Sequence, residues 1–363
     1  MLLTKFFRPI NNSFTALILL ASLFFVSCSG KEKENNNNLI NESSVLLDYL
    51  ENTGSVINSP EIPKLINADE VFENLHGSNY LVIDLRNSED FAKGHIKTSV
   101  NIQAENILNF FENIIEPNTF DKIILVCNNG FLSNHVNAVL RLLDYKNVFS
   151  LRYGLSSWNK TIAKDHWLAA RSSFLENKMD KETYEKPEKG ELPRINTNRK
   201  NAYNILRSRA EEVLNVTIDD ITISVKDVLE NQDDYFIINY WPQELYNKGH
   251  LKGAIQYTPK KSLSRDKFLL TLPVDKTIAV YCFTAHHSSW VVAYLRLLGY
   301  DVINIEYGAN SFIHNTLVNT QKVTRWFKES HIHNYPLVTE EDDIEINKNE
   351  TPETETITIQ GGC

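Results

Sequence analysis

Two stretches decide the fold of this chain: Ile123-Ile-Leu-Val-Cys127-Asn-Asn-Gly130 and Ile278-Ala-Val-Tyr-Cys282-Phe-Thr-Ala285. Each is a continuous apolar run of strand length that ends in a cysteine and a short loop. Such runs are typical of strands buried on both faces of a parallel sheet. Apolar residues at helical spacing then follow, namely Val136, Val139, Leu140 and Leu143 in the first case and Val291, Leu295 and Leu298 in the second. Each cysteine is therefore predicted to lie at a strand-to-helix turn.

The segments on either side of these two stretches also occur twice, so the chain contains an internal repeat. The first copy continues with Leu81-Val-Ile-Asp-Leu-Arg86, Gly94-His95 and Arg141-Leu-Leu143, and the second with Phe236-Ile-Ile-Asn-Tyr-Trp241, Gly249-His250 and Arg296-Leu-Leu298. Subtracting residue numbers gives 155 for His95 and His250, for Cys127 and Cys282, and for Arg141 and Arg296. A period this long exceeds the ~20 to 50 residues of solenoid repeats and indicates two complete globular domains.

The composition agrees with two folded domains and argues against a nucleic-acid partner. The 363 residues are 42% apolar and 23% charged, as in an ordinary folded protein, and the net charge is −9. Without a basic excess, no nucleic-acid partner is expected. Part of the acidity is local, in a run from Glu340 to Glu355 that is typical of a solvated tail.

The N-terminus has the pattern of a secretion signal. Lys5 and Arg8 precede an apolar run over 14–26, which is shorter than the ~20 residues that span a bilayer. The run ends in Phe25-Val-Ser-Cys28, which resembles the lipobox of bacterial lipoproteins, where the cysteine is acylated and becomes the mature N-terminus. We therefore expect a signal peptide over 1–27, lipidation of Cys28 and a flexible tether over 28–61. Plain secretory cleavage nearby is the alternative.

The remaining cysteines suggest chemistry. Cys127, Cys282 and Cys363 cannot all pair in disulfides. At the start of a helix, backbone N–H groups and the helix dipole stabilise a thiolate and can hold an anionic substrate or a persulfide. Cys127 and Cys282 are thus predicted nucleophiles, although a buried cysteine can also serve packing alone. Cys363, the last residue, either receives sulfur on a flexible arm or is accidental.

In these motifs the chain resembles the tandem rhodanese family. The matching segments are Asp84-Leu-Arg86 through Gly94-His95-Ile96, Cys127-Asn-Asn-Gly130, Arg152-Tyr-Gly154 through Trp158, Gly249-His250-Leu251, Gly253-Ala-Ile255, Cys282 and Leu297-Leu-Gly-Tyr300. The resemblance implies an α/β fold with two rhodanese-like domains, over 62–163 and 217–316, each with a mostly parallel central sheet flanked by helices. Between them lies a linker, 164–216, with a docking helix over Ala202 to Leu214. A C-terminal extension with the acidic tail covers 317–363.

Sulfur transfer is the activity that the family implies. A loop cysteine takes sulfane sulfur from a small donor, such as thiosulfate, 3-mercaptopyruvate or a polysulfide, and passes it from a persulfide to a thiol or to cyanide. Together with the lipid anchor, this predicts an enzyme on a membrane of the bacterial cell envelope, facing the periplasm or the outer surface. No cofactor or metal is expected, because His331 and His333 lack a third ligand nearby in sequence.

The two copies differ around their cysteines. Asn239 and Trp241 stand in place of Asp84 and Arg86, and Ala285 replaces Gly130, where a lost glycine can disturb the loop. The residues expected to bind substrate are Arg86, Asn128, Asn129 and Gly130 in the first copy and Thr284, His286 and His287 in the second. Because a histidine can supply charge or a proton and Leu132 cannot, Cys282 is predicted to dominate over Cys127.

Two other functions compete with sulfur transfer. A phosphatase of related fold would need a phosphate-binding arginine where Ser133 and Ser288 stand, and without that guanidinium the site loses its main charge stabiliser. A non-catalytic rhodanese-like lipoprotein that binds a partner or a small thiol is the second alternative, favoured by the altered motifs of the second copy.

Overall fold

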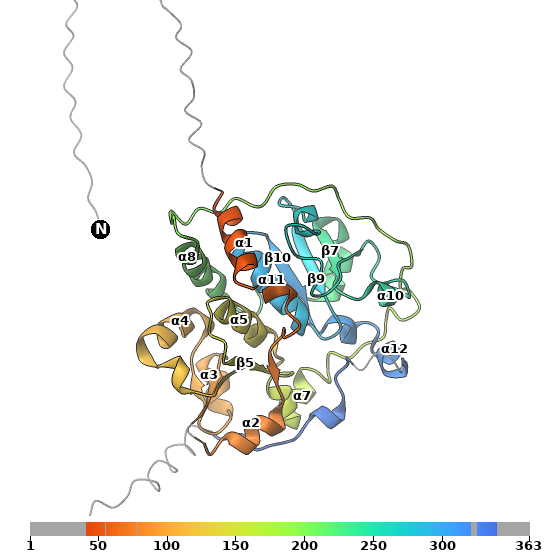
Figure 1. The fold of residues 1–363 in the computed structure, drawn as a ribbon. Helices are drawn as coiled ribbons and strands as arrows, with labels where there is room; N and C mark the ends of the chain where they lie inside the picture. Colours follow the sequence, from red (N-terminus) through yellow and green to blue (C-terminus); the bar gives the residue numbers. More distant parts are fainter. Residues whose placement is uncertain (1–40, 55, 78, 321–324, 340–363) are drawn as a thin grey trace, which may run out of the picture. The chain divides into compact units, whose positions relative to one another are not determined.

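The structure, a computed structural model, describes residues 41–54, 56–77, 79–320 and 325–339 (Figure 1). It contains two five-stranded sheets in which every strand pair is parallel, and helices flank both sheets. The predicted α/β class with two similar domains is therefore confirmed. Cys28, the signal peptide, Cys363 and the acidic tail lie outside the described residues.

The first domain has the strand order β1-β5-β4-β2-β3. Its elements in chain order are β1 (Leu65–Ile66), α2 (Ala68–Asn74), β2 (Tyr80–Asp84), α3 (Ser88–Lys93), β3 (Val100–Asn101), α4 (Ile107–Asn109), β4 (Lys122–Val126), α5 (Phe131–Leu142), β5 (Val148–Leu151), α6 (Leu155–Trp158) and α7 (Lys160–Asp165).

The second domain repeats this order as β6-β10-β9-β7-β8. Its elements are β6 (Thr222–Ile223), α9 (Val225–Glu230), β7 (Tyr235–Asn239), α10 (Gln243–Tyr246), β8 (Ile255–Gln256), β9 (Thr277–Tyr281), α11 (His286–Leu297), β10 (Val302–Ile305) and α12 (His314–Asn319).

The central strands β4 and β9 carry the two cysteines to the same place in each sheet. In β4 the residues from Ile123 to Val126 are fully buried, as the continuous apolar run requires. Asp84, at the end of β2, pairs with Val126, so Cys127 leaves the sheet at its carboxyl edge. Binding sites of open parallel sheets lie outside this edge. The fold thus places both cysteines at the edge of the sheet where proteins of this architecture commonly bind ligands.

The expectation of a flexible tether over 28–61 is wrong for its second half, where the chain forms helix α1 (Glu42–Asn52). Leu46, Leu47 and Leu50 are buried in the core that also holds residues of both domains. The hydroxyl of Ser43 donates to the carbonyl of Pro193 at 2.6 Å, and Glu51 accepts from the backbone N–H of Arg265 at 2.7 Å. Residues 41–52 are therefore a docked helix, because the apolar side chains at helical spacing outweigh the polar composition of the preceding sequence.

The linker contains α8 (Ala202–Leu214), where the docking helix is expected, and Ile205, Leu206, Val213 and Leu214 are buried. Asn201 caps this helix by accepting from the N–H of Tyr203 at 2.9 Å. Helix α8 contacts α1, α5 and α11, and α5 lies against α11. The apolar core therefore runs through both domains and the linker.

After α12 the chain returns to the first domain. Tyr335 donates its N–H to the carbonyl of Trp158 at 2.7 Å, and Val338 forms a bridge with His95. Within the described ranges, every helix is too short or too polar to span a membrane.

Candidate active site

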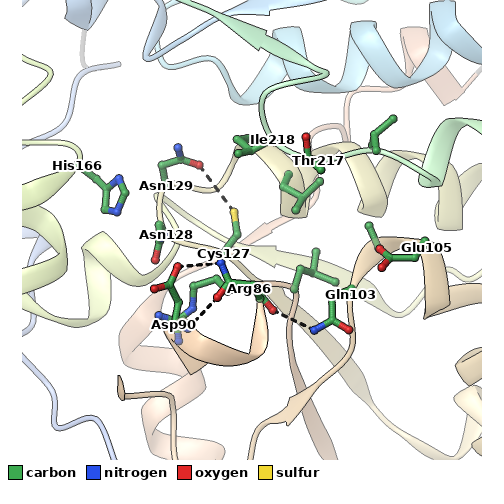
Figure 2. A pocket seen from close by; sticks show the side chains of 15 residues that line it. Arg86, Asp90, Gln103, Glu105, Cys127, Asn128, Asn129, His166, Thr217 and Ile218 are labelled. Carbon is green, nitrogen blue, oxygen red and sulfur yellow. Dashed lines mark hydrogen bonds between the residues drawn. The ribbon is translucent and has the colours of Figure 1, made fainter. Parts of the chain in front are cut away.

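Cys127 borders a cavity of about 330 Å³ at the carboxyl edge of the first sheet (Figure 2). The thiol follows β4, and the N–H of Gly130 donates to its Sγ at 3.2 Å. The hydroxyl of Ser133, in the first turn of α5, lies 3.6 Å from the same sulfur. The cavity is lined by side chains of the first domain and by Val216, Thr217 and Ile218, which follow α8. The Cys127 side chain is buried, at 5% exposure, but its thiol borders this cavity and accepts a hydrogen bond from a backbone N–H.

The backbone of the Cys127 loop is fixed at three consecutive carbonyls. Those of Cys127 and Asn128 accept from the N–H groups of Leu155 and Ser156 at 2.8 and 3.1 Å. The carbonyl of Asn129 accepts from the indole N–H of Trp167 at 2.9 Å. Because its carbonyls are fixed from outside, the loop keeps the Gly130 N–H directed at the sulfur without help from a substrate.

Arg86 lines the cavity, but its guanidinium is engaged elsewhere. Its Nε and Nη2 donate to the two carboxylate oxygens of Asp84 at 3.0 and 2.7 Å, and Nη2 also donates to the Gly94 carbonyl at 2.8 Å. Both side chains of this ion pair are buried. The pair fixes the turn after β2 and holds Arg86 in the cavity wall, and its expected role in binding substrate stays a prediction.

Cys282 is differently placed. Its Sγ accepts from the hydroxyl of Ser288 at 3.5 Å, and the side chain is buried. A cavity of about 370 Å³ borders Thr284, His286 and His287 but does not include this thiol. Trp241, at the position of Arg86, stacks on Phe283 with ring centroids 4.5 Å apart. Aromatic packing thus occupies the place of the polar motif. Cys282 does not line either of the two cavities described beside this loop.

The two histidines of the second loop serve the domain interface. His286 Nε2 accepts from the backbone N–H of Tyr153 at 3.1 Å, and its Nδ1 lies 2.9 Å from Thr284 Oγ1. His287 Nε2 lies 3.0 Å from the carbonyl of Ile62. Burial lowers the pKa of His286 to about 3 and that of His287 to about 4, so both are neutral at pH 7. The expectation that one of them supplies positive charge to Cys282 is therefore wrong.

Sequence reasoning also missed residues of the first site. Asp90, Gln103, Glu105 and His166 line the Cys127 cavity, although they come from separate segments of the chain. Burial lowers the pKa of His166, and Asp90 lies close enough to oppose this shift. In the sequence, Ser133 stands only for an absent arginine. Its place as the third residue of α5, in the turn that follows the Cys127 loop, is the signal that could have identified it.

A family model described as a rhodanese-like domain matches residues 67–161 and 224–315. The two matches together cover just over half of the chain, and each contains four of the five strands of one sheet, since β1 and β6 directly precede them. The chain therefore belongs to the rhodanese-like domain family, with two such domains.

Curated relatives match parts of the chain. The thiosulfate sulfurtransferase GlpE of Shewanella oneidensis is 24% identical over 100 residues, which are 28% of this chain and 96% of that protein. A tRNA uridine(34) hydroxylase of Prochlorococcus marinus is 26% identical over 122 residues, which are 32% of this chain and 36% of the hydroxylase. The chain thus spans little more than a third of the length of the hydroxylase.

Two solved structures match larger parts of the chain. The thiosulfate sulfurtransferase from Pseudomonas aeruginosa is 14% identical, with 76% of this chain and 69% of that chain covered and a TM-score of 0.26. SseA from Escherichia coli, described as a 3-mercaptopyruvate sulfotransferase, is 18% identical, with coverages of 66% and 97% and a TM-score of 0.23.

Proposed function

We propose that this protein is a sulfurtransferase that moves sulfane sulfur from a small donor, through a persulfide on Cys127, to a thiol or to cyanide. The observation that carries the proposal is the Cys127 sulfur itself, which accepts from the Gly130 N–H at 3.2 Å and opens onto a cavity of about 330 Å³. The family membership and the likeness to a thiosulfate sulfurtransferase support the same chemistry. Thiosulfate, 3-mercaptopyruvate and polysulfides are the candidate donors.

In this chemistry the Cys127 thiolate attacks the transferable sulfur of the donor. The bond between that sulfur and its carrier breaks, and the carrier leaves with the electron pair. The acceptor then attacks the outer sulfur of the Cys127 persulfide and restores the thiolate. A backbone N–H that is already directed at the sulfur stabilises negative charge without reorganisation in the reaction.

The second domain has a supporting role in this proposal. Two observations favour it: Cys282 lies outside the cavity beside its loop, and the neutral His286 and His287 bind backbone groups of the N-terminal half. This reverses the ranking that the sequence suggested. The proposed nucleophile is Cys127, and the second loop helps to hold the first.

Intact mass spectrometry of the purified full chain tests the assignment. After exposure to thiosulfate, 3-mercaptopyruvate or a polysulfide, the parent protein and Cys282→Ser are expected to gain one sulfur on Cys127. Cys127→Ser is expected to lose most of the gain and most of the turnover to cyanide. Sulfur that loads Cys127→Ser fully and Cys282→Ser poorly would contradict the assignment. A parent protein that gains no sulfur from any donor would favour the binding-module alternative.

We also propose that Cys28 is lipidated and anchors the two domains to a membrane of the bacterial cell envelope. The support is the N-terminal sequence, in which a short apolar run ends at Phe25-Val-Ser-Cys28. Cys28→Ser is expected to move the protein from the membrane to the soluble fraction, or to leave it unprocessed. Normal acylation and membrane fractionation of that variant would exclude this anchor.

A further inference from the structure

The cavity beside Cys127 is lined by more acidic than basic side chains, and this charge affects which sulfur donor can bind there. Asp90 and Glu105 line the cavity. Asp90 is paired with Lys93 Nζ at 3.1 Å, whereas Glu105 forms no salt bridge within the described ranges. The pKa of Asp90 is lowered, chiefly by a hydrogen bond from Lys93, so this carboxylate is ionised at neutral pH. Lys93 itself does not border the cavity. Two carboxylates therefore border the cavity, and the charge of Glu105 is the one that no ion pair offsets in the described part of the chain.

Positive charge is correspondingly scarce in this wall. Arg86 is the one cationic side chain among the described lining residues, and Asp84 binds it through both carboxylate oxygens. His166 is uncharged at neutral pH, because burial lowers its pKa. Leu132, at the end of the loop, adds an apolar surface, as do Val216 and Ile218 from the opposite side. A dianion would lose hydration here and gain no ion pair.

From this wall we propose that Cys127 takes sulfur from an organic persulfide whose carrier group is uncharged or cationic, and discriminates against thiosulfate, whose carrier is an anionic sulfonate. This inference rests on the proposed function and narrows its donor. The cavity, at about 330 Å³, has room for a small organic carrier beside the transferable sulfur. The apolar wall would contact the carrier's carbon atoms, and the carboxylates Asp90 and Glu105 would attract a carrier that bears an amine.

The transfer balances without a further reactant. The Cys127 thiolate attacks the outer sulfur of R–S–SH, the S–S bond of the donor breaks, and R–S⁻ leaves with the bonding electron pair. The product is Cys127–S–SH, in which the transferred sulfur keeps its proton. Cys127 is thereby oxidised from thiol to persulfide, and the carrier is reduced from persulfide to thiolate.

Three persulfides of similar size that differ in carrier charge test the proposal. They are those of cysteamine (cationic), N-acetylcysteamine (neutral) and 3-mercaptopropionate (anionic), with thiosulfate as a fourth donor. The rate of sulfur gain at Cys127 in the full chain is divided by the rate with free cysteine, which removes intrinsic reactivity. The normalised rate should be on the order of tenfold higher for the cationic than for the anionic persulfide. Thiosulfate should be the slowest donor.

Two variants link the preference to the wall. Glu105→Gln should reduce the ratio of cationic to anionic rates to about threefold, whereas Glu188→Gln, an exposed linker carboxylate, should leave it unchanged. Leu132→Arg should raise the rate with thiosulfate relative to the neutral persulfide. Equal normalised rates, or a preference for thiosulfate while Cys127 still gains sulfur, would overturn the donor class alone. Failure of all four donors to load Cys127 would instead overturn the proposed function.

Discussion

Gly130 and Ala285 occupy the same turn of the two cysteine loops, with φ of 94° and 58°. Both values lie in the left-handed region, which disfavours side chains with a Cβ. Ala285 nevertheless keeps the turn and is fully buried, so replacement of the glycine has not disturbed the second loop. At Gly130 there is less room, since a Cβ would stand 3.1 Å from His286 Nε2 and 3.2 Å from the backbone nitrogen of Gly154.

Gly130→Ala is therefore expected to lower the free energy of unfolding by about 1–2 kcal/mol. It should also slow sulfur gain at Cys127 by about tenfold, because the Gly130 N–H that binds Sγ must shift. Ala285→Gly is the matched control and should leave the rate of sulfur gain unchanged. Thermal unfolding and the kinetics of sulfur gain check both variants. A Gly130→Ala protein that gains sulfur at the parent rate would show that this turn does not control the position of the N–H group that binds Cys127 Sγ.

At the scale of elements, the first residues of α5 and α11 cross between the domains. His286, which begins α11, accepts from the N–H of Tyr153, and the ring of Phe131, which begins α5, packs 5.0 Å from that of Tyr307. Tyr153 and Tyr307 are equivalent residues, each with positive φ and each followed by a glycine. The turn after Tyr153 then binds the carbonyls of the Cys127 loop. The second loop thus supports the first.

His286→Ala is expected to slow sulfur gain at Cys127, although the residue belongs to the other domain. The change leaves the buried Tyr153 N–H without its acceptor, which costs about 1–3 kcal/mol and loosens the turn that holds the loop. The rate of sulfur gain and the midpoint of thermal unfolding should both fall. His76→Ala, at an exposed histidine, is the control. Parent kinetics in His286→Ala would mean that the two loops are independent.

For the molecule as a whole, three buried neutral histidines connect the two domains and the linker helix to one another. Besides His286 and His287, His135 on α5 lies 3.0 Å through Nε2 from the carbonyl of Val213 on α8. Burial lowers the pKa of His135 and of His287 to about 4, and that of His286 to about 3. The unfolded chain would protonate all three near pH 6.5. Protons therefore bind the unfolded state first as the pH falls.

Stability is thus predicted to be at its full value above pH 6.5 and to decline as the pH falls from 6.5 towards 4. At pH 5 each histidine should account for a loss of about 1–2 kcal/mol. Thermal unfolding at pH 7.5, 6 and 5 measures the slope, and His287→Gln should make it shallower than in the parent. A midpoint that stays constant between pH 7.5 and 5 would contradict neutral burial of these side chains.

The duplicated fold and the position of both cysteines could be predicted from the sequence, because they depend on local pattern. Continuous apolar runs such as Ile123 to Val126 specify buried strands, and helical spacing after each loop specifies α5 and α11. The same periodicity predicted α8. Helix α1 carries a comparable apolar pattern, but the polar residues that precede it in the sequence favour a tether.

Only the tertiary structure decided which cysteine borders a cavity and what charge surrounds it. His286 and His287 have the residue type of a catalytic group, yet their state depends on burial against Tyr153 and Ile62, which are more than a hundred residues away in sequence. The wall around Cys127 likewise joins Asp90, Glu105 and Ile218 from separate elements. Desolvation and pairing depend on every neighbour in space, whereas a sequence motif records only the neighbours along the chain.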